Sequence, residues 1–445
     1  MKPLDAVIIG SGPGGLGVGA LLAKAGKRVV VLERQGYIGG RATSYTWNGY
    51  TFNTGPHGGF VDGELDRLLR KVGKEPPARG IFDDAVTYKD KKIIPMLNLI
   101  RLDDPDLPRL LQAVTGVTPE QLATYDSVSA KEWLDSLEIK DDNLRTLVRL
   151  GILVGTTIPR LEEIAASAAI ESMRPLASPP QICWASHGYL SYMQLLADTI
   201  TEHGGEVRVN AEVVKVLVES NQVKGVLLEE GEKEISGEVR APHILESPVV
   251  VAAFPIWDLF ECISPNLFPE WFVQRVTHLK RTTAFFGLYA GLKEPLYREK
   301  HWILLDSPRT GYPLAAYMET NVCPELAPPG RHLFNCCYLC DLELTSLENR
   351  ERLYNLLDLA RQDLEEIFPG WEGKCLWIKP FIHSFEEPAR TPGRAGVFRP
   401  GPTSPAVEGL YFAGDTVTSR ALPGLECAAD SAMRCAEVIL SRRWS

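Results

Sequence analysis

The sequence predicts an α/β fold in which a Rossmann-like nucleotide-binding domain is discontinuous and carries an inserted α+β domain. Three observations predict it. A glycine-rich turn follows an apolar strand near the N-terminus, a strand-rich stretch in the middle of the chain ends in the apolar run 248–254, and a short apolar strand runs into Gly414 and Asp415. Parallel sheets of this kind bind ligands beyond the carboxyl ends of their strands, where such turns lie.

The N-terminal stretch has the spacing of a dinucleotide-binding turn. The apolar run 6–9 precedes Gly10, Gly12 and Gly15, a small-residue helix follows, and Glu33 ends the next apolar strand. The first glycine of such a turn allows a tight bend, the second lets the backbone approach a pyrophosphate, and the third lets the helix pack closely. An acid in the place of Glu33 accepts hydrogen bonds from a ribose diol and repels a 2′-phosphate. The stretch therefore predicts FAD or NAD rather than NADP.

Composition and charge exclude several other classes. The 445-residue chain has a formal net charge of −10, which argues against nucleic-acid binding. Among its nine cysteines, Cys336, Cys337 and Cys340 form one cluster, but the second Cys or His pair of a zinc site is missing. We therefore expect buried thiols, no metal and a cytoplasmic location. The uncharged stretch 6–23 is too rich in glycine to span a membrane, although a peripheral membrane contact stays open.

Two further turns identify the dinucleotide. Gly40 and Arg41 follow the second strand, where a guanidinium can neutralise pyrophosphate charge. Asp415 follows a short apolar strand and suits the hydroxyl chain of a ribitol. The helix that begins after Pro423, with Leu425 in its first turn, would direct its positive end at a flavin ring. Arg41 and Asp415 together indicate FAD, whereas the N-terminal stretch alone is equally compatible with NAD.

These motifs define the predicted domains and site. A strand at 211–218 is expected to offer a backbone contact to adenine near Val214. The predicted Rossmann-like FAD-binding domain comprises residues 1–75, 188–255 and 400–445, and the α+β substrate domain, with a helical insertion, comprises 76–187 and 256–399. The predicted cofactor-binding residues are Gly10, Gly12, Gly14, Gly15, Glu33, Arg34, Gly40, Arg41, Val214, Gly414, Asp415 and Leu425.

The N-terminal glycine turn, the Gly-Gly-Arg turn and the C-terminal Leu-Tyr-Phe-Ala-Gly-Asp segment stand in one order along the chain. In this the sequence resembles the FAD-dependent amine oxidase superfamily, and within it the branch of phytoene desaturase, carotenoid isomerase and retinol saturase. The resemblance implies a discontinuous FAD domain interleaved with a substrate domain. Two departures stand out. The lysine that amine oxidases carry near the flavin is missing around Gly287, and Asn53 stands where the family often has an aspartate.

Three functions are compatible with these residues. The first is an FAD-dependent desaturase, saturase or isomerase acting on carbon–carbon bonds of a small lipophilic, isoprenoid or carotenoid-like substrate. The second is a flavin oxidase of C–N bonds in an amine or amino acid, and the third is a non-catalytic FAD- or lipid-binding protein. His57 is the candidate catalytic acid or base, because an imidazole titrates near neutral pH. The aromatic candidates for the substrate pocket are Trp184, Phe285, Phe286, Tyr317 and Tyr338.

Overall fold

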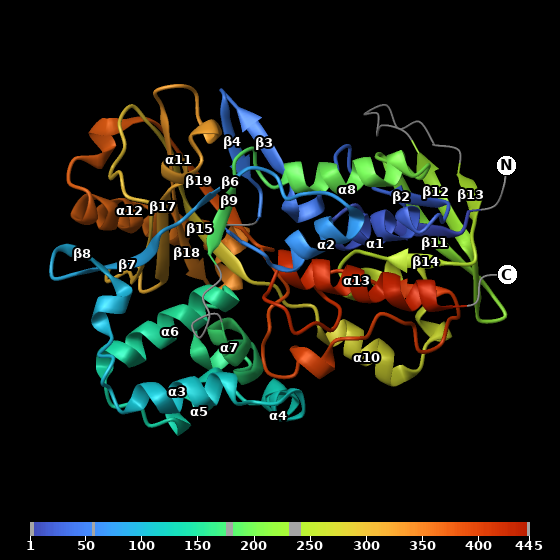
Figure 1. Cartoon of the computed structure of the whole chain (residues 1–445), viewed down its shortest axis with the longest axis horizontal. Helices are drawn as coiled ribbons and strands as arrows, with labels where there is room; N and C mark the ends of the chain where they lie inside the picture. The colour runs from blue at the N-terminus through green and yellow to red at the C-terminus, as the bar shows by residue number, and fades with distance from the viewer. Residues whose placement is uncertain (1–3, 56–57, 175–180, 231–241, 443–445) are drawn as a thin grey trace.

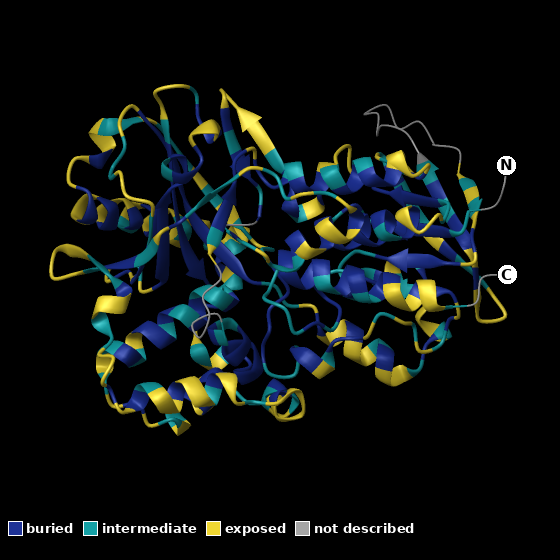
Figure 2. Cartoon of the chain, viewed as in Figure 1, coloured by how far each residue is buried: buried dark blue, intermediate teal, exposed yellow. Residues whose placement is uncertain are grey.

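The computed structural model describes residues 4–55, 58–174, 181–230 and 242–442. Two β-sheets organise this part of the chain, one at each end of the long axis, and a lobe of helices lies beside the second sheet (Figure 1). The strands of both sheets are mostly buried, whereas the outer faces of the covering helices are exposed (Figure 2). The prediction of His57 as an acid or base falls outside the described residues.

The first sheet is parallel and collects strands from distant parts of the chain. Its spatial order is β10 (Glu206–Arg208), β2 (Val29–Leu32), β1 (Ala6–Ile9), β14 (Val250–Ala252) and β20 (Leu410–Phe412). Val250 pairs with Val7 on one side and with Leu410 on the other. The carboxyl ends of these strands therefore meet at one edge, which brings Gly10 and Gly414 together.

Both faces of the parallel sheet are covered, as the unbroken apolar runs of its strands require. One face packs against helices α1 (Pro13–Lys24), α2 (Glu64–Val72), α8 (Leu190–Glu202) and α13 (Leu425–Ser441). The other face packs against α9 (Leu259–Cys262), α10 (Glu270–His278) and an antiparallel sheet of β11 (Ala211–Glu219), β12 (Gln222–Glu230) and β13 (His243–Glu246). The result is a three-layer domain.

The second large sheet is mixed and has seven strands. Its order is β19 (Cys375–His383), β15 (Ala284–Leu292), β18 (His332–Cys340), β17 (Pro313–Met318), β16 (His301–Asp306), β7 (Asp84–Lys89) and β8 (Lys92–Pro95). Helix α12 (Arg350–Ile367) covers one face. Side chains of α6 (Asp142–Thr156) reach the opposite face, which we call the inner face.

The helical lobe inserts between β8 and β9. It comprises α3 (Asp106–Thr115), α4 (Pro119–Thr124), α5 (Ala130–Ser136), α6 and α7 (Ala166–Met173). Helices α4 and α5 each begin with a capping box, in which a Thr or Ser side chain and a Gln or Glu side chain satisfy each other's backbone N–H groups. None of the helices in the described ranges is long and apolar enough to cross a membrane.

Short strands connect the two large sheets. They are the hairpin β3 (Ser44–Trp47) and β4 (Tyr50–Asn53), and the small sheet of β5 (Gly59–Phe60), β9 (Ile182–Ala185) and β6 (Arg79–Ile81); the short helix α11 (Glu319–Val322) follows β17. Their aromatic side chains pack with those of β15 and β17 into one cluster that includes Phe52, Trp184, Tyr289 and Tyr317. The division into two discontinuous domains remains a prediction, with these sheets as the two cores.

Candidate active site

The turn after β1 keeps an open space beside the helix N-terminus. Gly10 has φ +101°, and a Cβ there would lie 2.6 Å from the Ala253 carbonyl oxygen. A Cβ on Gly15 would overlap the Gly10 carbonyl oxygen, so this glycine lets α1 pack on the strand. Gly12 caps α1 without a side-chain hydrogen bond, and nothing lies within 4 Å of a Cβ placed there. The space at Gly12 and the free N–H groups of the first helical turn suit a phosphate.

Gly14 and Gly40 bring separate segments close to this turn. A Cβ on Gly14 would lie 2.8 Å from the backbone nitrogen of Gly414, so α1 touches the turn after β20 at this point. Gly40 has φ +56°, and its Cβ would lie 3.6 Å from the Cα of Gly12. The predicted N-terminal and C-terminal motifs therefore form one site.

The acid that ends β2 is held by its neighbours. Glu33 is buried, and its Oε2 accepts hydrogen bonds from the backbone nitrogen of Ser11 at 3.0 Å and from the Ser11 hydroxyl at 2.7 Å. The other oxygen accepts from the backbone of Gln35. Ser11 was not predicted, although its place between two motif glycines was the available signal. Arg34, which was predicted to bind the cofactor, has an exposed side chain.

The predicted adenine contact lies on a strand that is fastened to Glu33. The backbone nitrogen of Ala211, the first residue of β11, donates to the Glu33 carbonyl oxygen at 2.8 Å. Val213 pairs with Leu228 and Lys215 pairs with Leu227, so Val214 has no partner residue in this register. A bulge of this kind leaves backbone groups outside the ladder. Val214 can therefore offer them to a ligand near Glu33.

Arg41 and Asp415 are brought together from opposite ends of the chain. Nη2 of Arg41 lies 2.8 and 2.7 Å from the two oxygens of Asp415, and Nη1 donates to the carbonyl oxygen of Glu386 at 2.8 Å. The guanidinium also lies 4.1 Å from the centroid of the Phe385 ring. Because Glu386 follows β19, Arg41 links the parallel sheet to the seven-stranded sheet at the edge where β20 ends.

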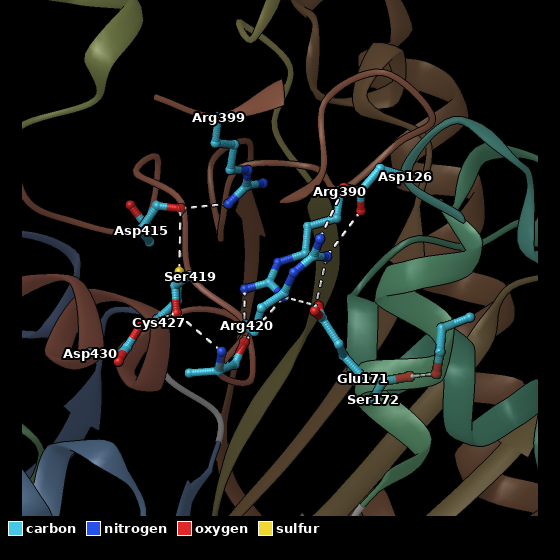
Figure 3. Close-up of polar contacts among 12 residues, drawn as sticks. Asp126, Glu171, Ser172, Arg390, Arg399, Asp415, Ser419, Arg420, Cys427 and Asp430 are labelled. Atoms are coloured by element: carbon cyan, nitrogen blue, oxygen red, sulfur yellow. Dashed lines mark hydrogen bonds and ion pairs between the residues drawn. The ribbon is translucent and has the colours of Figure 1, made fainter. Parts of the chain in front are cut away.

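A network of buried arginines stabilises the segment between β20 and α13 (Figure 3). Arg399 donates to the carbonyl oxygens of Asp415 at 2.6 Å and Pro388 at 3.0 Å. Arg390 contacts Glu171 of α7 at 3.1 Å and the carbonyl oxygen of Ala421. Burial lowers the pKa of Arg399, and the nearby Arg390 lowers it further. These arginines were not predicted, because their partners lie far away in the sequence.

Helix α13 begins next to this network. Gly424 is its N-cap with φ +67°, and Leu425 is buried in the first turn. The hydroxyl of Ser431 accepts a hydrogen bond from the backbone nitrogen of Gly414 at 2.7 Å. The oxygens of Glu426 cap α2 instead, through the backbone nitrogen of Leu65 at 3.1 Å. The first backbone N–H groups of a helix have no acceptor within the helix, so those of α13 can bind a ligand.

Two observations test whether a flavin dinucleotide fits these residues. No other segment of the described chain comes within 4 Å of a Cβ placed on Gly12 or Gly414, so both positions leave room for a ligand to approach the backbone. The Nδ2 of Asn53 is buried, and no described residue accepts a hydrogen bond from it, while its Oδ1 accepts from Ser44 and Tyr189. Such a ligand needs both hydrogen-bond donors and acceptors. The Asn53 amide beside a glycine-dense turn supplies a donor, and Glu33 supplies an acceptor for the ribose hydroxyls.

Comparison with known proteins identifies the family. The family model for flavin containing amine oxidoreductases matches residues 13–440. The chain belongs to this family. It is an FAD-dependent oxidoreductase, and FAD is its cofactor.

The relatives of this flavoprotein are distant. It is 23% identical to a 4,4'-diapophytoene desaturase (4,4'-diapolycopene-forming) of Methylomonas sp over 338 residues, which cover 68% of this chain and 64% of that protein. It is 50% identical over 70 residues to the all-trans-retinol 13,14-reductase of Rattus norvegicus, covering 15% of this chain and 12% of that protein. The solved oxidoreductase of Methanosarcina mazei shares the fold, with a TM-score of 0.76 at 22% identity over 98% of this chain and 100% of that chain. In each of these two sequence relatives, the match covers less than two thirds of the relative's own length.

The Arg41–Asp415 pair provides a test of the predicted FAD contacts. Asp415→Asn removes the negative charge that holds Arg41 and weakens an acceptor for ligand hydroxyls. We expect the dissociation constant for FAD to rise about 10- to 100-fold, which is roughly 1.4 to 2.8 kcal/mol. Flavin fluorescence titration measures this constant. Asp430→Asn is the matched control, because this aspartate of α13 contacts Ser419 and Arg434 instead; equal losses in both variants would contradict the prediction.

Proposed function

We propose that this flavoprotein acts on carbon–carbon bonds of a small lipophilic, isoprenoid-like substrate. The apolar inner face of the seven-stranded sheet is the observation that carries the proposal. Phe285, Leu304, Ala315 and Cys337 are buried there in one cluster with Leu147 of α6. Such a wall excludes water and suits a hydrocarbon chain. The desaturase and the retinol reductase among the relatives are named for reactions of this kind.

The register of β15 favours this proposal over amine oxidation. Gly287 stands opposite Phe381, and a Cβ on Gly287 would overlap the Cys336 carbonyl oxygen. A lysine therefore cannot replace this glycine without moving β18. Lys280 is 68% exposed and lies 3.8 Å from Asp258. Neither position supplies the lysine typical of amine oxidases.

The aromatic predictions divide between the two faces of the sheet. Trp184 and Tyr317 belong to the aromatic cluster, and Phe285 belongs to the inner-face cluster. Phe286 and Tyr338 were wrongly predicted as pocket residues, because they stack at 5.0 Å under α12 on the other face. Successive residues of a strand point to opposite faces, which separates Phe285 from Phe286.

Hydride transfer is the chemistry that this proposal implies. When bound, FAD supplies a hydride acceptor or donor at its ring. The chain's own part is to orient an apolar substrate and to keep water away from the reacting carbon atoms. Where β15 approaches β4, the Tyr289 hydroxyl donates a hydrogen bond to the carbonyl oxygen of Asn53 at 3.4 Å. Burial raises the pKa of Tyr289 well above its usual value. Tyr289 therefore keeps its proton at neutral pH. His57 as the catalytic acid or base remains a prediction.

Anaerobic spectroscopy of the FAD-loaded protein tests the proposal. Phytoene, diapophytoene and retinol are presented in detergent, and the flavin absorbance is followed together with the products. Bleaching of oxidised flavin by a polyene precursor, or reoxidation of reduced flavin by retinol, supports action on carbon–carbon bonds. Flavin bleaching by putrescine and hydrogen peroxide release in air would establish C–N oxidation instead. A flavin that dithionite reduces but no substrate class changes would favour a binding protein.

An apolar surface near this wall suits peripheral membrane contact. Leu97 and Leu102 are 65% and 91% exposed, and Ile93 on β8 is also exposed. Met96 and Ile100, which lie between them in the sequence, pack into the inner-face cluster. Exposed and buried apolar residues therefore follow one another along residues 93–102, so the exposed side chains lie next to the inner-face cluster. This is the arrangement expected where a lipophilic substrate enters from a bilayer.

The charge of the neighbouring hairpin predicts anionic lipid as the contact. Lys91 and Lys92 lie at the β7–β8 turn of a protein whose net charge is −10. We expect the double variant Leu97→Ser/Leu102→Ser to lose at least about tenfold of its affinity for anionic vesicles, since each leucine contributes roughly 1.5 kcal/mol or more when buried. Vesicle cosedimentation measures this. Leu347→Ser, at a leucine 87% exposed elsewhere, is the control; unchanged sedimentation of the double variant would contradict the prediction.

A further inference from the structure

The buried carboxyl of Glu387 lies at the N-terminus of α13. Its side chain is 4% exposed. Oε1 accepts a hydrogen bond from the Thr157 hydroxyl at 2.8 Å. Oε2 lies 3.6 Å from the place of a Cβ on Gly424, the N-cap of α13. Glu387 is thus next to the helix end that the sequence predicts to face the flavin, and none of the predicted FAD contacts uses it.

Two hydroxyl groups connect this carboxyl to the surface. The Thr157 hydroxyl lies 2.9 Å from that of Thr283, which in turn accepts a hydrogen bond from the backbone nitrogen of Glu387 at 3.3 Å. Both threonines line a surface pocket whose other lining residues include Glu163 and Arg281. The side chains of those two residues are 30% and 36% exposed. A hydroxyl both accepts and donates, so this arrangement can carry a proton from the pocket to Glu387.

Charged groups of both signs act on the Glu387 carboxyl: Arg390 and Arg399 lower its pKa, and Asp415 raises it. Arg390 is paired with Glu171, and Arg399 reaches the carbonyl oxygen of Asp415 (Figure 3). The carboxylate of Asp415 is paired with Arg41. Burial raises the pKa of Glu387 to about 7, against the opposing effect of Arg390 and of the Thr157 hydrogen bond. Burial raises the pKa of the adjacent Glu386 well above its usual value, so that this carboxyl stays neutral. The protonation of Glu387 is therefore sensitive to one further charge nearby.

We propose that Glu387 exchanges a proton with solvent through Thr157 and Thr283, and takes one up when FAD at the N-terminus of α13 is reduced. The inference rests on the proposed function as a redox flavoprotein. Reduction by dithionite adds two electrons and one proton to the flavin, which becomes an anion. A second proton, drawn from solvent, converts the Glu387 carboxylate to the acid. The negative charge of the reduced flavin is the cause, because it raises the affinity of a neighbouring carboxylate for protons.

The pH dependence of the flavin potential tests the proton count. For a two-electron couple, one proton changes the midpoint potential by about 30 mV per pH unit, and two protons change it by about 60 mV. We expect the steeper slope in the wild type above a pH of about 7, the pKa of Glu387. Glu387→Gln should show the shallower slope and take up one proton fewer per flavin, as an indicator dye records during photoreduction. Glu426→Gln is the matched control. Glu426, in the first turn of α13, is also a buried carboxyl whose pKa is raised to about 7, but its oxygens cap α2.

The rate of proton uptake tests the route and does not depend on Glu387→Gln folding. Thr157→Val keeps the shape of the side chain and removes the hydroxyl, so proton uptake after rapid reduction should slow at least about tenfold with unchanged stoichiometry. Thr157→Ser restores the hydroxyl and should restore the rate. Thr282→Val is the control, since the Thr282 hydroxyl binds the Ser384 carbonyl oxygen instead.

The outcomes separate this inference from the proposed function. An unchanged slope in Glu387→Gln, or uptake as fast in Thr157→Val as in the wild type, overturns the role of Glu387 and leaves the substrate assignment intact. Reduction of the flavin by amines but not by polyenes overturns the substrate assignment and leaves the proton count valid. A protein that binds no FAD would overturn both.

Discussion

Replacing Gly12 by alanine is expected to give a folded protein that no longer holds FAD. Gly12 has an ordinary backbone conformation, φ −70° and ψ 179°, and nothing lies within 4 Å of the new Cβ. The methyl group would instead fill the space in which the pyrophosphate approaches the backbone. We expect the FAD dissociation constant to rise at least about 100-fold, roughly 2.7 kcal/mol. Flavin content after purification and the thermal unfolding midpoint without cofactor measure the two effects separately.

A second glycine of the same motif should behave in the opposite way. The Cβ of Gly15→Ala would overlap the Gly10 carbonyl oxygen, so the helix must move away from the strand and the protein should lose stability even without FAD. Gly401→Ala is the control, because this exposed glycine has open space around it. A Gly12→Ala protein that retains its flavin would show that the pyrophosphate does not lie against this turn.

The turns that meet at the candidate cofactor site could be predicted because their sequence signals are short-range. The spacing of Gly10, Gly12 and Gly15 could be recognised within one short stretch. Only the limit on Gly15, which is the Gly10 carbonyl oxygen, lies inside that turn, whereas the backbone that crowds Gly10 is that of the distant Ala253. Two distant segments could be assigned to the same site only where each of them carried its own recognisable motif. Arg41 and Asp415 were each expected to face the ligand, but their contact with each other was not foreseen.

The buried polar network could not be predicted, because its contacts join residues that are far apart in the sequence. Arg390 and Glu171 are 219 residues apart, and nothing near either one indicates the other. Helix α7, which carries Glu171, was not expected either. It is composed of small residues buried on nearly every side, so it lacks the polar stripe that marks a helix in a sequence. Strand β17 is similar: it begins with Pro313, and all six of its residues are buried, which removes the alternation of a half-exposed strand.

Glu319→Gln is expected to make the protein more stable than the wild type at alkaline pH. Glu319 is fully buried. Its Oε1 accepts a hydrogen bond from Asn335 at 3.1 Å, and no described residue bonds to its Oε2. Burial raises its pKa from 4.5 to about 8. The folded protein therefore retains a proton that the unfolded chain releases above about 4.5. This stabilisation is complete below that pH and is lost as the pH rises through about 8.

The sign and size of the effect follow from this window. Glutamine stays neutral at every pH, so the variant should be no more stable than the wild type at acid pH and more stable at alkaline pH. The difference in the free energy of unfolding should change by up to about 5 kcal/mol across the window, since the pKa moves from 4.5 to about 8 and one pKa unit corresponds to about 1.4 kcal/mol. Denaturant unfolding at both ends of the window measures it. Glu325→Gln, at an exposed neighbour, should show no such change. If the difference in the free energy of unfolding between Glu319→Gln and the wild type did not change with pH, the prediction would be wrong. That result would mean that the Glu319 carboxyl is ionised inside the fold.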